Sequence, residues 1–424
     1  LWQGDAPQPA DASDWTAFRD AALSDGQSEA FYRANEDLPN LYSFLGVNRL
    51  IGNVDVRPGD NYRYYHRSSD DRWLIIPYDL DMQFIAAHHW GGTMDGVVVA
   101  GVPNTFRALM RHPALAVEFR NRCRELLSLI ASDPSPHGGQ IGQLVDEYAQ
   151  MVNPEGQALT WAGVDAAMWN LHPRTPNNGG NKGPRGSFFR ATYYDGTRGG
   201  LGGTVRTLTW LRRLQDLDGD GFGDHKAMMQ WFVDFATNTY PTDGPAWLRK
   251  AVSTGTGDDP SPDRQKGYGY KYLEWESLYG GFADATSEPG IPPDLSFPNR
   301  PAISYTGPEG FPTNSLTFQS SAFSPSVTGG TTFAAMQWRI GEISAPGIPG
   351  YDPSQPRIYE IEDVWTSPEV PIFNASIRVP IAKAGPGRMY RARVRHKDAN
   401  GRWSYWSDPL QFTPSAPDVT LYQR

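Results

Sequence analysis

Hydrophobic residues recur at helical spacing in two segments near the start of the chain. In SDWTAFRDAAL, which begins at Ser13, the apolar side chains fall close to one face, and Ser13 is a candidate N-cap. In PNLYSFLGVNRLIGNVD the apolar residues again follow helical spacing, and Gly52 is expected to end that helix. The pattern therefore predicts two helices before residue 53.

The pattern then changes to the residue types that are typical of strands. NYRYYHR (61–67) and RWLIIPYDL (72–80) are rich in aromatic and β-branched residues, and the polar turn SSDD separates them. This arrangement predicts a β-hairpin. Beyond it, a helical region is expected over residues 104–131.

The second half of the chain changes character twice. Residues 173–204 are rich in Gly, Pro and Asn, which predicts a long surface loop or lid. From residue 294 onward, strands alternate with Gly/Pro turns over about 120 residues, a usual size for an antiparallel β-sandwich. The predicted fold class is α+β, with a mostly helical region at 1–293 that includes the hairpin, an all-β sandwich at 294–415 and a tail at 416–424.

The best-defined part of the predicted sandwich is RMYRARVRHKDANGRWSYWSDPLQFT. Tyr390, Ala392 and Val394 alternate along one strand, DANG supplies a turn, and a last strand follows. The stretch resembles the final hairpin of fibronectin type III modules, including a Tyr in the penultimate strand. The resemblance implies a fibronectin type III or Ig-like module, and an unrelated sandwich remains the alternative.

Composition and charge narrow the classes of partner. Hydrophobic residues make up 39% of the chain and include 14 Trp, which is ample for packed cores. The formal net charge of −9 argues against a nucleic-acid-binding protein. Cys123 is the single cysteine, so it cannot form an intrachain disulfide, and a buried small side chain is its expected role. No stretch approaches the length of a membrane-spanning helix.

Polar residues gather at one end of the predicted hairpin. Asp79 and Asp81 are two residues apart on a strand, so they are expected to share a face. Asn61 opens the other strand, and Asp55 lies in the preceding loop. Carboxylate and amide oxygens suit a hard cation such as Mg²⁺. On this reading Asp55 acts as a base, Asn61 and Asp79 hold metal against nucleotide phosphates, and Asp81 supports them. The alternative is that Asp79 and Asp81 cap a strand and bind backbone amides or Arg.

The combined pattern GNVDxxxxxNYRYY…DRWLIIPYDLDM resembles the signature of the CotH kinase family, the spore-coat-associated atypical protein kinases. The resemblance implies a kinase-like fold, of which residues 1–293 would supply the C-lobe. Asp55 would be the catalytic-loop aspartate and Asp79 the metal aspartate, with ATP and Mg²⁺ or Mn²⁺ as cofactors. It also implies a secreted, extracellular or cell-envelope protein, some relatives of which phosphorylate Ser/Thr of coat proteins.

Two features depart from the family pattern. Tyr78 stands where the family has Trp, and residues 1–54 contain neither a Lys nor a Gly-rich strand–loop. A kinase needs an N-terminal lobe over the nucleotide, so either that lobe lies on a cleaved or separate segment or it has been lost, and the chain as given is expected to be incomplete for catalysis. Because the first residue is Leu1 and not Met, we expect a processed or partial chain. An upstream segment of its own precursor is then a candidate partner that would supply the N-lobe.

A second metal site is predicted in DLDGDGFGD. Asp216, Asp218, Asp220 and Asp224 alternate around Gly221, as at the start of a calcium loop. Ala227 occupies the twelfth position in place of Glu, which excludes a complete EF-hand, and the motif resembles shorter dockerin-like or thrombospondin-like loops. A structural Ca²⁺ is expected there, which favours an extracellular setting. A solvated acidic turn is the alternative.

Two functions follow from these patterns, and they belong to different classes. The first is an extracellular CotH-like protein that, in its full form, binds ATP·Mg²⁺ and phosphorylates Ser/Thr of a secreted or coat protein. The second is a non-catalytic, calcium-stabilised structural or adhesive surface protein on a kinase-like scaffold. A retaining glycosidase ranks last, because hydrolysis needs carboxylates on both sides of the bond, whereas Asp79 and Asp81 share one strand.

Overall fold

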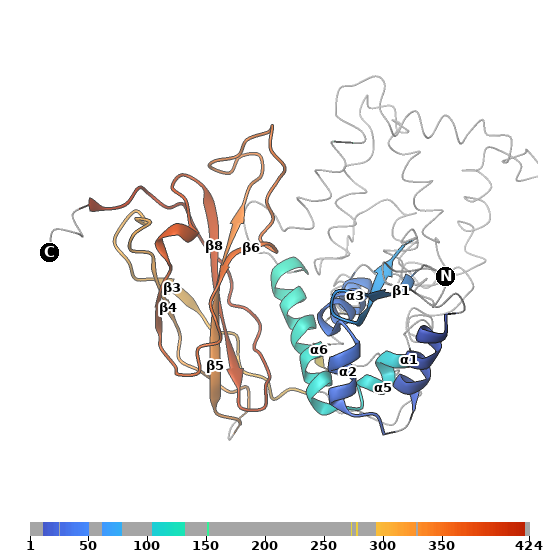
Figure 1. Cartoon of the computed structure of the whole chain (residues 1–424). Coiled ribbons are helices and arrows are strands. Elements are labelled where there is room, and N and C mark those ends of the chain that lie inside the picture. The colour runs from blue at the N-terminus through green and yellow to red at the C-terminus, as the bar shows by residue number, and fades with distance from the viewer. Residues whose placement is uncertain are drawn as a thin grey trace, which may run out of the picture. The chain divides into compact units, whose positions relative to one another are not determined.

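The protein divides into two compact units. In a computed structural model, the N-terminal unit comprises residues 1–119 and 144–291, and the C-terminal unit comprises residues 120–143 and 292–424. Helices and strands are both present, as the α+β prediction requires (Figure 1). The structure describes residues 12–24, 26–50, 62–78, 104–131, 294–327 and 330–419, together with Met151, Leu273, Ser277 and Leu278.

The described helices of the N-terminal unit begin with α1 (Ser13–Leu23), which confirms the first predicted helix. Ser13 is its first helical residue, so the expectation that Ser13 caps the helix is wrong; Ala12 occupies that position without a side-chain cap. The other described helices are α2 (Glu29–Asn35), α3 (Leu38–Leu50), α5 (Asn104–Leu109) and α6 (Pro113–Leu126), and a π-helical turn, Leu127–Ala131, follows α6.

Helix α2 has no counterpart among the predicted elements. Its N-cap is Ser28, whose hydroxyl accepts a hydrogen bond from the Phe31 amide at 3.2 Å. Glu29 in the first turn pairs with Arg33 one turn later, the favourable order for such a pair on a helix. Local capping and pairing therefore define this short helix.

The predicted hairpin is confirmed. β1 (Tyr62–Arg67) and β2 (Arg72–Pro77) pair antiparallel, with Tyr62 opposite Pro77 and Arg67 opposite Arg72. Asp71 in the connecting turn has φ 59°, a left-handed conformation that Asp tolerates better than most residues.

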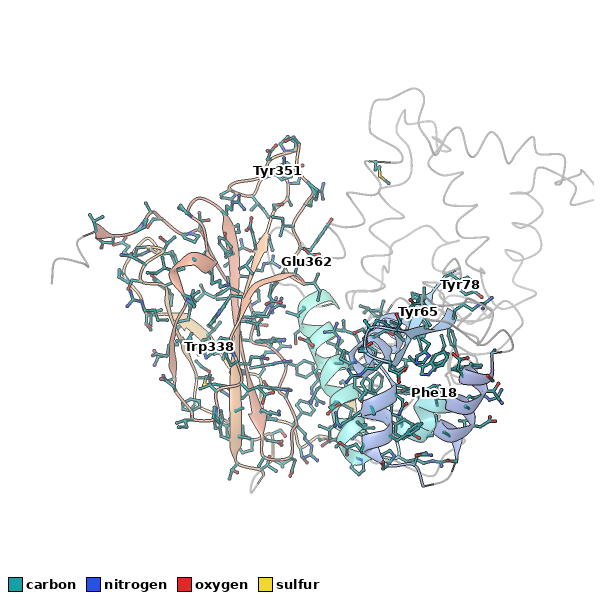
Figure 2. All side chains as sticks on the ribbon, in the orientation of Figure 1. Phe18, Tyr65, Tyr78, Trp338, Tyr351 and Glu362 are labelled. Carbon is teal, nitrogen blue, oxygen red and sulfur yellow. The ribbon has the colours of Figure 1, made fainter. Side chains whose placement is uncertain are left out.

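Aromatic side chains join α1 to this hairpin. The ring of Trp15 stacks on Tyr64 at 4.5 Å between centroids, and Phe18, which Figure 2 labels, stacks on Trp73 at 5.3 Å. Such pairs contribute about 0.5–1.5 kcal/mol each beyond the burial of their area. The hairpin is therefore held against a helix by its own aromatic face.

The C-terminal unit contains two antiparallel sheets. A three-stranded sheet has the order β3-β4-β7 and a four-stranded sheet the order β6-β5-β8-β9. The residues of both sheets share one hydrophobic core, in which Phe318 and Val394 are buried together with Trp338, which Figure 2 labels. The strands are β3 (Ile303–Tyr305), β4 (Thr317–Ser320), β5 (Phe333–Ile343), β6 (Asp363–Thr366), β7 (Ser376–Arg378), β8 (Met389–Asp398) and β9 (Leu410–Phe412), with a 3-10 turn at Ile381–Lys383.

Strand β8 shows the alternation that the sequence predicted. Tyr390, Ala392 and Val394 are buried in the shared core, whereas Arg391 and Arg393 fall on the opposite face of the four-stranded sheet. The predicted last strand is confirmed as β9, which pairs with β8. The fibronectin type III or Ig-like identity of this unit stays a prediction at this point.

Candidate functional site

The predicted magnesium site lies at the end of the hairpin where the structural description stops. Asp55, Asn61, Asp79 and Asp81 are outside the described residues. Their described neighbours are paired: Tyr62, which follows Asn61, lies opposite Pro77, two positions before Asp79. The chain therefore enters and leaves the hairpin through one end. That these four side chains lie close together stays a prediction.

Strand β2, which leads towards Asp79, is paired along both of its edges. β1 occupies one edge, and the segment Glu36–Asn40 covers the other. The Asp37 amide donates to the Trp73 carbonyl at 2.8 Å, and Glu36 bridges Trp73 as a parallel neighbour.

Asn40 completes this second edge with its side chain. Its Oδ1 accepts from the Ile75 amide at 2.7 Å, and its Nδ2 donates to the Ile75 carbonyl at 3.2 Å. A side-chain amide carries the same donor and acceptor as a peptide group, so Asn40 acts as one residue of a strand. It fixes β2 four positions before Asp79.

A positive charge lies at the same end of the hairpin. The guanidinium of Arg63 lies 4.6 Å from the centre of the Tyr78 ring, a cation–π contact across the two strands. Tyr78 therefore retains an aromatic face at the position where the family motif has Trp. Arg63 brings a cation next to the segment in which phosphate binding is predicted.

A buried acid lies beneath the hairpin, and the sequence reasoning missed it. Glu36 is 2% exposed, and neither carboxylate oxygen has a hydrogen-bond partner among the described residues. Burial raises the pKa of Glu36 to about 8. Glu36 is therefore largely protonated near neutral pH. Nothing in the sequence indicated that Glu36 is buried, because an acid in a connection between two helices is usually exposed on the surface.

Tyr64 of β1 is close enough to this acid to respond to its charge, and Tyr62 lies next to Tyr64. Burial, with the charge of Glu36 as the next cause, raises the pKa of Tyr64, whose hydroxyl shares a hydrogen bond with Thr105 at 2.9 Å. The Tyr62 hydroxyl is buried without a partner among the described residues, and burial raises its pKa as well. Glu36, Tyr62 and Tyr64 are therefore largely uncharged near neutral pH, although all three are polar.

Within the part of the chain that the structure describes, no group of three or more His, Cys, Asp or Glu could hold a metal ion. The residues of both predicted metal sites lie outside that part of the chain, so both sites stay predictions. Asp216, Asp218, Asp220 and Asp224 of the predicted calcium loop lie outside the described residues, as does the connection at 173–204.

A comparison with protein families bears on the N-terminal unit. Residues 3–165 match the family model described as CotH kinase protein. The match spans the motif and the hairpin, and it supports the relationship to the CotH family that the sequence indicated. It covers less than half of the chain and includes no strand of the C-terminal unit. No curated protein matches the chain. Among the described helices, none is long and apolar enough to cross a membrane.

Proposed function

We propose that the CotH-like region, residues 3–165, binds ATP with Mg²⁺ or Mn²⁺ at the open end of the β1–β2 hairpin. In its longest natural form the protein would phosphorylate Ser/Thr hydroxyls of a secreted or coat protein, outside the cell or in its envelope. The observation that carries this proposal is the family match, because it spans Asp55, Asn61, Asp79 and Asp81.

In the proposed reaction the hydroxyl oxygen of the acceptor forms a bond to the γ-phosphorus as the bond from that phosphorus to the bridging oxygen breaks. ADP leaves, and the hydroxyl proton passes to Asp55. Asn61 and Asp79 would hold the metal that neutralises phosphate charge, with Asp81 in support. Such transfer depends mainly on positioning and electrostatic stabilisation, so the rigidity of the scaffold matters.

Two described features support this assignment. β2 is paired on both edges, partly by Asn40, which restricts the strand that leads to Asp79. Arg63, stacked on Tyr78, places a cation beside that strand end, where phosphate oxygens would be favoured.

The test is nucleotide binding by the longest natural form of the protein, measured by calorimetry with ATP and Mg²⁺ or Mn²⁺. Asp79→Asn should weaken metal-dependent binding at least about tenfold, since it removes a charged ligand. Asp71→Asn makes the same change at the opposite end of the hairpin, at a residue 90% exposed, and should bind as wild type does. Absence of nucleotide binding by the longest form would reject the proposal.

The C-terminal unit supports a second proposal, that of a fibronectin type III or Ig-like module. By position in the chain, its sheets hold strands 1-2-5 and 4-3-6-7, the arrangement of Ig-type sandwiches that carry an added strand beside the third. Tyr390 adds to this, because its hydroxyl accepts from the Gly385 amide at 2.9 Å, five residues upstream. This resembles the tyrosine corner of such domains.

Such a module would also suit the non-catalytic alternative, a calcium-stabilised surface protein. That alternative requires a metal effect without nucleotide binding. EDTA should then lower the melting temperature, and Asp218→Ala should reproduce the loss. If EDTA leaves the melting temperature unchanged, the calcium proposal fails.

A further inference from the structure

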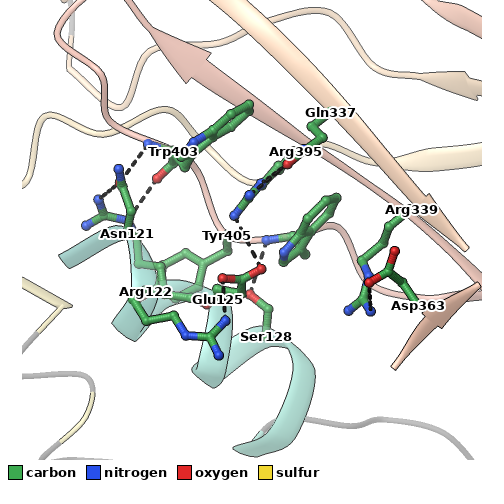
Figure 3. Close-up of polar contacts among 12 residues, drawn as sticks. Asn121, Arg122, Glu125, Ser128, Gln337, Arg339, Asp363, Arg395, Trp403 and Tyr405 are labelled. Atoms are coloured by element: carbon green, nitrogen blue, oxygen red, sulfur yellow. Dashed lines mark hydrogen bonds and ion pairs between the residues drawn. The ribbon is translucent and has the colours of Figure 1, made fainter. Parts of the chain in front are cut away.

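A polar stripe runs along the C-terminal half of α6 and into the π-helical turn. Its members are spaced three, four and seven residues apart, so they share one face, and Figure 3 labels Asn121, Glu125 and Ser128. All of them belong to the C-terminal unit. They are Asn121, Arg124, Glu125 and Ser128.

The stripe hydrogen-bonds to the backbone of the segment between β8 and β9. Asn121 Nδ2 donates to the Gly401 carbonyl at 2.9 Å, and its Oδ1 accepts from the Trp403 amide at 2.8 Å. Ser128 Oγ accepts from the Trp406 amide at 3.1 Å. Side chains of a helix thus supply partners that a neighbouring strand would otherwise provide (Figure 3).

Arg124 strengthens the same attachment. Its Nε donates to the Trp403 carbonyl at 2.8 Å, and its guanidinium lies 4.6 Å from the centre of the Phe297 ring. Arg124 is fully buried, and burial lowers its pKa to about 10. A buried cation needs such partners, so this residue is built into the C-terminal unit.

Facing the stripe, cations and indole rings alternate on the face of the four-stranded sheet opposite the core. Arg395 lies between Trp403 and Trp406, with its guanidinium 4.4 Å from the centre of each ring. Lys397 extends the stack over Trp403 at 5.3 Å, and Arg339 lies 5.9 Å from the Trp406 ring. This stack forms the surface that the C-terminal half of α6 packs against.

Glu125 adds a carboxylate to that cationic surface. One of its oxygens lies 3.8 Å from Arg395, and the other accepts from Arg122 on the helix at 2.7 Å. Burial by itself raises the pKa of Glu125, but the charges of Arg395 and Arg122 outweigh it and hold that pKa below its usual value.

A second carboxylate lies further along the same face. Glu360 is fully buried; it contacts Arg393 and accepts from Arg391 at 3.0 Å. Gly341 permits this approach, because a Cβ there would meet Glu360 at 2.9 Å. One face of the sheet therefore carries four arginines, Arg339, Arg391, Arg393 and Arg395. Their positive charge is offset in part by Glu360 and in part by Glu125.

We propose that this face is a helix-docking surface and that its partner is the chain's own segment Arg120–Ala131. The C-terminal unit is then assembled from two distant parts of the chain, and the strands from residue 294 onward are incomplete without the helix. The surface recognises this helix in two ways. Asn121 and Ser128 hydrogen-bond to its backbone groups, and the Glu125 carboxylate, at a fixed spacing from them along the helix, pairs with its cations. Because the helix occupies it, outside partners of this unit must use other surfaces.

The test uses the full chain and the double variant Asn121→Ala/Ser128→Ala. Hydrogen exchange at the Trp403 and Trp406 amides should become roughly fivefold to tenfold faster, the effect of losing one hydrogen bond each. Melting of the C-terminal unit should fall by roughly 4–8 °C. The control is Gln355→Ala/Lys383→Ala, a change at two exposed polar residues of the same unit, which should leave both amides and the melting unaffected.

Glu125→Gln provides a milder second variant, since it keeps the shape and removes the charge. It should lower the melting of the C-terminal unit without accelerating exchange in α3. If the C-terminal unit of the double variant fails to fold while its N-terminal unit stays folded, that result would also support the proposal. Unchanged exchange at both amides, or unchanged melting in Glu125→Gln, would overturn it.

Discussion

Replacing Glu36 with glutamine should remove a large pH dependence of stability from the N-terminal unit. Glu36 is 2% exposed, and burial raises its pKa from the ordinary 4.5 to about 8. Between these values the unfolded chain has lost the proton while the folded chain keeps it. Unfolding is therefore favoured as pH rises through this window.

The size of the effect follows from the pKa shift. Each unit of pH in the window lowers the free energy of unfolding by about 1.4 kcal/mol. The loss reaches about 3 kcal/mol at pH 7 and about 5 kcal/mol above pH 8. A glutamine side chain cannot ionise, and it fills nearly the same volume. Glu36→Gln should therefore match wild type near pH 4.5 and be more stable by about 2–3 kcal/mol at pH 7.

The assay is differential scanning calorimetry of the full chain at several pH values between 5 and 8. A gain of this size should raise the melting temperature of the N-terminal unit by roughly 4–12 °C at pH 7. Glu309→Gln changes an exposed carboxylate and should leave both transitions where they are in wild type. Parallel pH profiles for wild type and Glu36→Gln over this range would refute the reasoning.

Three further predictions concern His396, Asn40 and Tyr390. Burial lowers the pKa of His396 to about 4, so the C-terminal unit should keep its full stability above about pH 6.5 and lose about 3 kcal/mol as pH falls to 4; His396→Gln, measured by calorimetry, should abolish that loss. Asn40→Ala should speed hydrogen exchange at the Ile75 amide roughly tenfold, and unchanged exchange would contradict the edge pairing. Tyr390→Phe should lower the melting of the C-terminal unit by roughly 2–6 °C, because the Gly385 amide loses its partner; an unchanged melting temperature would count against that role.

The hairpin was predictable because its signals are local. Two runs of strand-forming residues flank the polar turn SSDD, and the structure pairs them from Tyr62 opposite Pro77 to Arg67 opposite Arg72. The alternation of Tyr390, Ala392 and Val394 was equally local, since one face of β8 is buried in the core. Periodicity identifies elements when one face is buried and the other is not.

Other features had no such signal. Helix α2 spans Glu29–Asn35, too short for its apolar residues to show a clear period. The burial of Glu36 depends on tertiary packing, which the residues next to it in the sequence do not predict. The bond from Asn121 to Trp403 joins residues 282 positions apart, so nothing near either residue predicts it. The sequence indicated the motif around Asp79, and its geometry stays a prediction.

Asn40 and Asn121 show why hydrogen bonds from side-chain amides to the backbone cannot be predicted from sequence patterns. Each presents one amide to a backbone, Asn40 to both polar groups of Ile75 and Asn121 to Gly401 and Trp403. The amide imitates a peptide group, so the partner segment gains an edge neighbour without any strand in the sequence. An Asp in either place keeps the acceptor and loses the donor, and an Ala leaves both backbone groups without their partner. Both contacts should therefore tolerate few substitutions, although neither residue stands out in composition, charge or periodicity.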